Sequence, residues 1–308
     1  MIYFFLLSLI LTNFLIRKNI NFFKDFISSI PNKRSMHIDP HPNGGGIVFA
    51  LVTTVFGIFS NFYLPLISLP LSFMGLLDDK YKIKAIIRFF SQMFTVLALI
   101  FFESNIFNNI NYEYLLINLL LIFLFLIFAV GIVNILNFMD GIDGILAGSM
   151  IPIILVIVLK YKIFILLPFL GSLIGFLFLN WYPSKIFMGD SGSLFIGAMY
   201  IGILLLLPDL EAIIKFLILS MPLIGDGVFC LIRRYLNGKN IFEAHKDHLY
   251  QRLLQSGMKH STVSLIYISS IIILGIAFLI ESNLLMGISL VSIFIYAFYL
   301  EKYKAIRF

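Results

Sequence analysis

Long apolar stretches recur along almost the whole chain, and they limit what it can fold into. Sixty per cent of the 308 residues are hydrophobic and only 12% are charged, which is too little polar surface for a soluble protein of this length. Most of the stretches are long enough to cross a hydrocarbon layer of roughly 30 Å as helices. Membrane helices tolerate the lone Pro and Gly residues within them. The sequence therefore predicts an all-α, polytopic membrane protein.

We expect about eleven membrane-spanning helices (10–11) in one integral-membrane catalytic domain, residues 1–308. The expected spans are residues 1–16, 43–60, 62–77, 85–102, 114–133, 145–159, 163–180, 192–207, 212–232, 262–280 and 283–300. Where a span is short, its boundary residues or a local adjustment of the bilayer must supply the rest of the crossing. The cytoplasmic loops are expected at about residues 17–42, 78–84, 134–144, 181–191 and 233–261.

The basic residues predict the orientation in the membrane. No positive charge precedes the first apolar run and no small-residue cleavage site follows it, so we expect an uncleaved span with its N-terminus outside. An odd number of spans then leaves the C-terminus in the cytoplasm. In this topology 19 of the 22 Lys and Arg residues lie on the cytoplasmic side, as the positive-inside rule requires.

The same topology gathers the titratable side chains on one face. All five histidines and most aspartates fall on the cytoplasmic side, although neither was used to build the topology. The net charge of +6 follows the membrane orientation and does not indicate a nucleic-acid partner. We therefore expect a multi-pass protein of the bacterial inner membrane whose active site faces the cytoplasm.

Two adjacent carboxylates, Asp78 and Asp79, close the third expected span in the sequence GLLDDKYKI. Neighbouring carboxylates at a membrane boundary repel each other, and burying them unpaired is costly. A divalent cation, or the nearby cations Lys80, Lys82 and Arg88, would relieve this repulsion. Taken alone, a solvated helix end explains the pair equally well.

A denser set of oxygen ligands lies in residues 134–148, NILNFMDGIDGILAG. If this segment is helical, Asn137, Asp140 and Asp143 follow one another at a spacing of three and share much of one face. The glycine after each aspartate lets a ligand approach the backbone closely. A plain connection between membrane helices would not need this many oxygen ligands, so a binding site is favoured.

Asp190 stands at the start of a span, in residues 178–197, FLNWYPSKIFMGDSGSLFIG. A helix N-terminus offers free N–H groups and the positive end of its dipole to a phosphate. Asp190 itself offers a hard oxygen ligand to a cation. The alternative is an ordinary capped helix start, because Asp and Ser both cap helices well.

A segment rich in histidine and basic residues, AHKDHLYQRL, covers residues 244–253. His245 and His248 are three residues apart and Arg252 lies one turn further on, so they are neighbours if the segment is helical. Zinc would need more ligands, but Cys230 lies in an apolar run and no third histidine is suitably spaced. We expect the segment to bind phosphates, with a solvated amphipathic turn as the alternative. His37, just before a glycine-rich stretch, is a less specific candidate.

Together these segments place hard oxygen ligands and phosphate-binding groups on one membrane face. That combination suits phosphoryl transfer, in which positioning and charge neutralisation do most of the work. The oxygen-rich set favours Mg²⁺, or Mn²⁺, held by few carboxylates and shared with substrate phosphates. Asp190 and Asp79 are the expected metal ligands.

With these motifs in order, the chain resembles the polyprenyl-phosphate N-acetylhexosamine-1-phosphate transferases, glycosyltransferase family 4. The form AHKDHLYQRL is similar to the branch that initiates O-antigen or related surface glycans. The resemblance implies transfer of a sugar-1-phosphate from a UDP-N-acetylhexosamine to undecaprenyl phosphate, which yields UMP. It also allows a homodimer, and it leaves the sugar, the glycan pathway and the polyprenyl length open.

The resemblance also implies roles for single residues. Asp190 would ligate Mg²⁺ at the UDP diphosphate, and Asp78 and Asp79 would lie by the lipid phosphate, either of them acting as a base or orienting group. The expected substrate-binding residues are Asn137, Asp140, Asp143, His245, His248, Arg252, Arg88 and His37. Asn43 departs from the family pattern, because many relatives carry a basic residue before the glycines.

Two other classes of membrane protein compete with this interpretation. A transporter would carry charged residues near the middle of its spans, whereas here the carboxylates gather at one boundary. Another Mg-dependent transferase, such as an intramembrane prenyltransferase, also uses paired aspartates, but it would need a different spacing between them.

Overall fold

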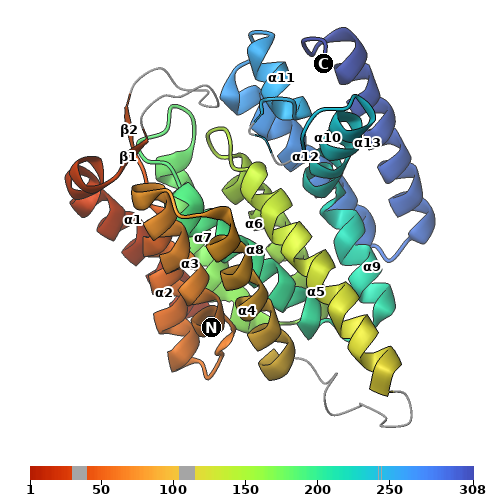
Figure 1. Cartoon of the computed structure of the whole chain (residues 1–308). Coiled ribbons are helices and arrows are strands. Elements are labelled where there is room, and N and C mark those ends of the chain that lie inside the picture. Colours follow the sequence, from red (N-terminus) through yellow and green to blue (C-terminus); the bar gives the residue numbers. More distant parts are fainter. Residues whose placement is uncertain (30–39, 104–114, 242, 244) are drawn as a thin grey trace.

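The computed structural model describes residues 1–29, 40–103, 115–241, 243 and 245–308. Within these residues the chain is almost entirely helical (Figure 1). The helices are α1 (Ile2–Phe26), α2 (Gly46–Phe59), α3 (Leu64–Tyr81), α4 (Ala85–Glu103), α5 (Leu115–Phe138), α6 (Ile145–Tyr161), η3 (Phe164–Leu166), α7 (Leu167–Asn180), α8 (Gly189–Leu206), α9 (Leu210–Leu219), α10 (Met221–Leu236), α11 (Leu249–Gln255), α12 (His260–Leu279) and α13 (Asn283–Tyr303).

Each apolar stretch predicted as a span is a helix or a pair of helices in the structure, so the all-α polytopic class is confirmed. By length and composition, six described helices can cross a membrane, or seven if the bent pair α9–α10 is one span. Residues 46–59, 145–161 and 164–180 form shorter apolar helices. The number of eleven crossings stays a prediction.

The structure differs from the predicted boundaries at several helix ends. Helix α5, for example, continues to Phe138 and so includes the first residues of the predicted loop 134–144. Helix α1 continues past residue 16 through Arg17, Lys18 and Lys24 to Phe26, because polar residues extend a helix as well as apolar ones do. Two-residue strands follow, β1 (Ser28–Ser29) and β2 (His41–Pro42), and they pair in an antiparallel manner. The expected span 212–232 is not one helix, since α9 and α10 meet at Ser220 with a bend of 75°.

Helix α8 is the central element of the bundle. Every residue from Ser191 to Leu204 is buried, and helices α2, α3, α4 and α5 all pack against it. Because membrane helices gain little from hydrophobic burial against one another, close packing is what fixes their arrangement. The N-terminus of α8 is therefore held firmly at one end of the bundle.

The outer helices keep large apolar side chains exposed. Helix α13 exposes Ile288, Val291, Ile295 and Phe298, and α5 exposes Leu116 and Phe123 in the same way. Apolar faces of this size on a soluble protein would drive association, whereas a bilayer covers them. The two chain ends lie at opposite ends of the bundle (Figure 1).

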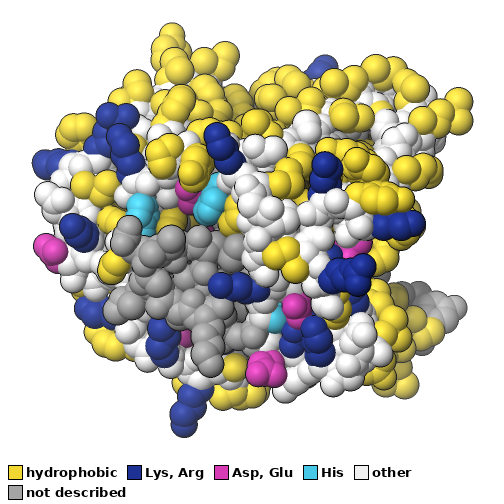
Figure 2. Space-filling model, turned by 90° about the horizontal axis from the view of Figure 1, so that it is seen from above, with side chains coloured by type: hydrophobic (Ala, Val, Ile, Leu, Met, Phe, Trp, Pro, Cys, Tyr) yellow, Lys and Arg dark blue, Asp and Glu magenta, His cyan; other side chains and the backbone are white. Residues whose placement is uncertain are grey.

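The end of the bundle at the top of Figure 1 carries the polar side chains. Seen from above, Lys and Arg side chains are spread around this face, with histidine and acidic side chains among them (Figure 2). The same end holds α11 and the C-terminus. This is the face that the sequence predicts to be cytoplasmic.

Candidate active site

Asp78 is tied to the start of the next helix. Its Oδ2 accepts a hydrogen bond from Arg88 Nη1 at 2.6 Å, and its Oδ1 accepts one from the backbone N–H of Ile83 at 2.7 Å. The carboxylate is buried, whereas the Arg88 side chain is 37% exposed. Asp78 therefore orients a guanidinium group that remains accessible to a ligand.

Asp79 points to the N-terminus of α8. Its Oδ2 accepts a hydrogen bond from the backbone N–H of Asp190 at 3.0 Å. Negative charge is favoured at this position because the first N–H groups of a helix lack partners within it. The contact brings carboxylates from α3 and α8 to one point, although 111 residues separate them in the sequence.

Asp190 completes a compact charged cluster with Asp78, Asp79 and Arg88. Its Oδ2 lies 3.9 Å from Arg88 Nη1, and its side chain is 30% exposed. Gly75 allows the approach of α3, because a Cβ at that position would overlap the carbonyl oxygen of Asp190. We call Asp78, Asp79, Asp140, Asp190 and Arg88 the acidic cluster.

Asp140 lies in the short connection between α5 and α6. Burial, together with the negative charges of Asp190 and Asp143, raises the pKa of its carboxyl to about 8. A carboxyl group with so high a pKa lacks a compensating cation. Nearby, Asn137 accepts a hydrogen bond from Ser193 Oγ of α8 at 2.9 Å, which ties the end of α5 to the same helix.

Asp143 has partners that Asp140 lacks. Burial raises the pKa of Asp143, but His260, 3.6 Å away, and hydrogen bonds from Ser184 outweigh it, so the net shift is downward. The donors are the Ser184 backbone N–H at 3.1 Å and its Oγ at 3.0 Å. His41 lies 3.3 Å from the same Oγ. Asp143 thus joins the loops of the site to α12.

The residues of the acidic cluster suit a hard divalent cation. Carboxylates from α3, α8 and the connection after α5 meet there, and oxygen is the ligand that Mg²⁺ prefers. Asn43 Oδ1 is buried beside Gly189 and accepts no hydrogen bond from the described residues. An orphaned buried acceptor and an unusually basic carboxyl group both indicate that positive charge belongs at this point.

The histidine segment lies on a different group of helices. Asp226 of α10 accepts hydrogen bonds from the backbone N–H groups of Leu249 and Tyr250 and from Tyr267 Oη. It therefore holds the start of α11, next to His248. Tyr250 connects this region to the acidic cluster, since its Oη donates to the carbonyl of Phe138 at 2.8 Å.

Arg252 has protein partners rather than an open position. Its guanidinium group donates to Glu301 at 2.6 Å and to the carbonyl of Ile306 at 2.9 Å, and the side chain is 4% exposed. Burial lowers the pKa of His245 to about 4 and also lowers that of His248. The prediction that this segment binds substrate stays a prediction, and His37 lies outside the described residues.

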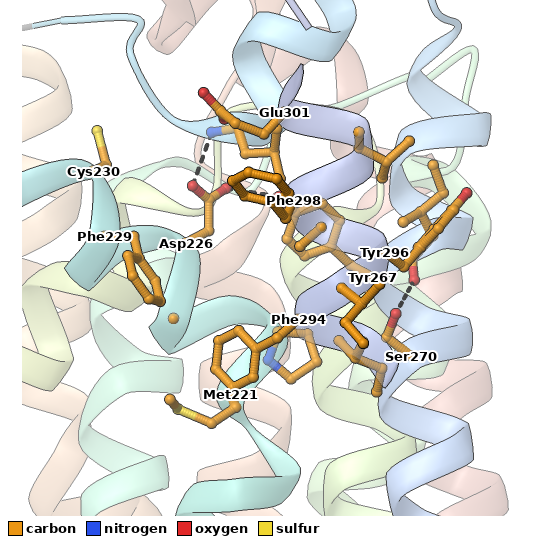
Figure 3. A pocket seen from close by; sticks show the side chains of 18 of the residues that line it. Met221, Asp226, Phe229, Cys230, Tyr267, Ser270, Phe294, Tyr296, Phe298 and Glu301 are labelled. Atoms are coloured by element: carbon orange, nitrogen blue, oxygen red, sulfur yellow. Dashed lines mark hydrogen bonds between the residues drawn. The ribbon is translucent and has the colours of Figure 1, made fainter. Parts of the chain in front are cut away.

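A cavity of about 640 Å³ opens between α10, α12 and α13. Its walls are mostly apolar, with Asp226 pointing inward and Glu301 and Cys230 at one end (Figure 3). The sequence pointed to the aspartates and to Arg88, but it gave no signal for Ser184 or His260 as partners of Asp143. Both contacts depend on tertiary packing.

Comparisons with known proteins agree on one family. The model of glycosyl transferase family 4 matches residues 61–208, which include the aspartates of the acidic cluster. A probable undecaprenyl-phosphate N-acetylglucosaminyl 1-phosphate transferase of Bacillus subtilis is 37% identical over 139 residues, 43% of this chain and 38% of that protein.

Two further relatives match shorter segments. A decaprenyl-phosphate N-acetylglucosaminephosphotransferase of Mycobacterium leprae is 32% identical over 31% of this chain. A phospho-N-acetylmuramoyl-pentapeptide-transferase of Kosmotoga olearia is 34% identical over 27%. The aligned segments cover 28% and 30% of these two relatives, so the chain matches well under half the length of the curated relatives.

Proposed function

We propose that this chain, whose residues 61–208 match the model of glycosyl transferase family 4, transfers a sugar-1-phosphate from a UDP-N-acetylhexosamine to undecaprenyl phosphate. The products are undecaprenyl-diphospho-sugar and UMP, the first membrane step of a surface glycan. The observation that carries the proposal is the acidic cluster, which brings Asp79, Asp140, Asp190 and Arg88 together at one end of a membrane bundle.

In the proposed reaction an oxygen of the lipid phosphate attacks the β-phosphorus of the donor. A new P–O bond forms there, and the bond between that phosphorus and the bridging oxygen breaks, so UMP leaves with the electron pair. A phosphate monoester has a second pKa near 6, so much of the acceptor is already a dianion at neutral pH. The reaction therefore does not depend on a protein base.

Asp78 and Asp79 serve different purposes in this proposal. Asp78 is occupied by Arg88 and by the backbone of Ile83, so it acts as an orienting group. Arg88 remains accessible and stabilises negative charge on a phosphate group. Asp79 and Asp190 provide carboxylates for Mg²⁺, with Mn²⁺ as a substitute.

Bound Mg²⁺ would neutralise the diphosphate of the donor and the developing charge on UMP. Asn137, Asp140 and Asp143 line the proposed nucleotide side of the site. We place this site on the cytoplasmic face of the bacterial inner membrane, where nucleotide sugars are available.

The test is UMP release by the purified protein in detergent, with undecaprenyl phosphate, Mg²⁺ and a panel of UDP-N-acetylhexosamines. We expect release to require both the lipid and the metal, and Asp190→Asn to abolish it. The best donor would identify the sugar. If folded protein releases no UMP from any donor, the proposal is wrong, and a transporter or a different Mg-dependent membrane transferase becomes the leading alternative.

A further inference from the structure

The strongest unexplained cluster lies beside the cavity, on α10 and the segment before α11. Cys230, His245 and His248 each offer one ligand atom, and these three atoms lie within 4.8 Å of one another. Cys230 Sγ is 3.9 Å from His245 Nδ1, and the two imidazole rings stack at 5.0 Å. From the sequence we expected Cys230 to lie apart from these histidines, in an apolar run. In the structure Cys230 lies next to them.

The polar pattern of α10 explains how the cluster forms. Asp226, Cys230 and Arg234 follow one another at a spacing of four and share one face of the helix. Asp226 binds the first N–H groups of α11. Arg234 pairs with Asp247 and donates to the carbonyl of Asn240 at 2.6 Å. Contacts on both sides of Cys230 therefore hold the histidine segment against it.

A buried imidazole atom in this cluster lacks a partner. Among the residues that the structure describes, none forms a hydrogen bond with His248 Nδ1, and the side chain is only 2% exposed. Asp226 Oδ1 lies 3.8 Å from this atom, too far for a hydrogen bond. Burying an unsatisfied polar atom costs free energy, so a ligand is expected in this space.

We propose that Cys230, His245 and His248 form a binding site for a zinc-class transition-metal ion. Thiolate and imidazole are ligands of Zn²⁺ rather than of Mg²⁺. Around a tetrahedral Zn²⁺ such atoms lie about 3.3–3.8 Å apart, given metal–ligand distances of roughly 2.0–2.3 Å. The ligand atoms lie within 4.8 Å of one another, so the pair that is furthest apart must close by up to about 1.5 Å when the ion binds. The thiol proton leaves to solvent as the metal–sulfur bond forms.

The proposed metal site adjoins the cavity through Cys230, whereas His245 and His248 are not among the residues that line it. Cys230, Asp226 and Asp247 all line that cavity, and Figure 3 shows Cys230 at its edge on the same helix as Asp226. A water molecule or a carboxylate can therefore complete the tetrahedron. The ion would fasten the segment before α11 to α10, next to Tyr250 and the connection that carries Asp140. This role does not depend on the proposed transfer reaction.

The experiment measures zinc in the full-length protein after removal of any purification tag. Protein is loaded with Zn²⁺, washed free of excess metal and analysed by elemental mass spectrometry. We expect one zinc per chain, its loss in Cys230→Ser, and its retention in His260→Gln, a histidine variant outside the cluster. Co²⁺ in place of Zn²⁺ should give a thiolate-to-metal charge-transfer absorption that Cys230→Ser removes.

A second measurement does not depend on any variant. Cys230 is the one cysteine of the chain, so alkylation of thiols reports on this residue alone. Zn²⁺ should slow the alkylation at least tenfold, whereas Mg²⁺ should leave it unchanged. Absence of retained zinc in the wild-type protein, or equal retention in Cys230→Ser, would overturn the proposal. Neither result bears on UMP release, which reports separately on the acidic cluster.

Discussion

Asp78 and Asp79 are neighbours in the sequence, yet their side chains have different partners. Asp78 holds Arg88 and the backbone of Ile83, and Asp79 holds the first N–H of α8. Successive residues of a helix point about 100° apart, so one pair can serve two adjacent elements. The sequence left open which of the two has an orienting role, and the geometry favours Asp78.

The guanidinium group of Arg88 is a positive charge that lies against the carboxylates of the acidic cluster and remains accessible to a ligand. We expect Arg88→Gln to lower the rate of transfer by about 10²- to 10³-fold, the typical cost of losing one preorganised donor to developing charge. Lys84→Gln removes an exposed positive charge nearby and should retain activity within a small factor. Steady-state rates of UMP release check both, and equal losses in the two variants would contradict the role of Arg88.

The histidines near Cys230 predict a pH dependence of stability in the metal-free protein. Burial, together with the electrostatic effect of His248 and Arg234, lowers the pKa of His245 to about 4. An unfolded chain has histidines with a pKa near 6.5. Between these values the unfolded state binds more protons, so stability falls as pH drops from 6.5 toward 4.

The measurement is thermal unfolding in detergent with a chelator present, at pH 7.5, 6 and 5. We expect the melting temperature to fall over this range and to fall less in His245→Gln, which has no proton to take up there. A melting temperature equally dependent on pH in both proteins would show that other groups control the effect. Above pH 7 residue 245 should not make the melting temperature of either protein depend on pH.

At the scale of elements, the site depends on where α8 begins. Gly189 has a φ of +70°, a backbone conformation that glycine adopts at little cost. This turn places the backbone N–H of Asp190, at the start of α8, against Asp79, and it places the Asp190 side chain beside Arg88. Close packing of α3 against the same turn then fixes their separation.

Substitution of Gly75 tests whether the site needs the close packing of α3 against α8. In Gly75→Ala the new methyl group would overlap the carbonyl oxygen of Asp190, so α3 and α8 must move apart. Overpacking of this kind typically costs about 1–3 kcal/mol, and the displaced carboxylate should also lower the transfer rate. Gly287→Ala on α13, where an added Cβ meets open space, is the control. Parallel assays of melting temperature and UMP release would show whether only the first variant is impaired.

The positions of the helices were largely predictable, because apolar length is a local property. Their ends were less so. Residues 17–26 extend α1 although charged and amide side chains interrupt their apolar residues. The bend between α9 and α10 occurs at Ser220, before a proline that membrane helices often tolerate. Helix α11 is too short and too polar to stand out from a loop.

The aspartates of the site were predictable for a different reason. A one-sided distribution of carboxylates is visible once the topology is drawn, and Asp79 and Asp190 do meet in the structure. The contacts of Asp143 with His260 and of Cys230 with His245 were not predictable. Both contacts depend on how segments that are distant in the sequence pack together. Nothing in the residues next to His260 or Cys230 in the sequence predicts these partners.

At the scale of the whole molecule, the bundle separates an apolar exterior from a polar end. Helices α5 and α13 present apolar faces suited to lipid, while charged side chains surround the end that carries α11 and the C-terminus (Figure 2). A site at this boundary can receive a lipid phosphate from the membrane and a nucleotide sugar from water. The architecture is therefore consistent with a reaction that joins a soluble donor to a lipid acceptor.

In the proposed reaction a sugar-1-phosphate, rather than the sugar alone, moves to the lipid. A UDP-N-acetylhexosamine labelled with ³²P at the β-phosphate, together with undecaprenyl phosphate and Mg²⁺, distinguishes the two. We expect the label to appear in the extracted lipid, unlabelled UMP to be released in equal amount, and Asp190→Asn to show neither. Label recovered only in UDP, with unlabelled lipid carrying the sugar, would contradict the proposed reaction.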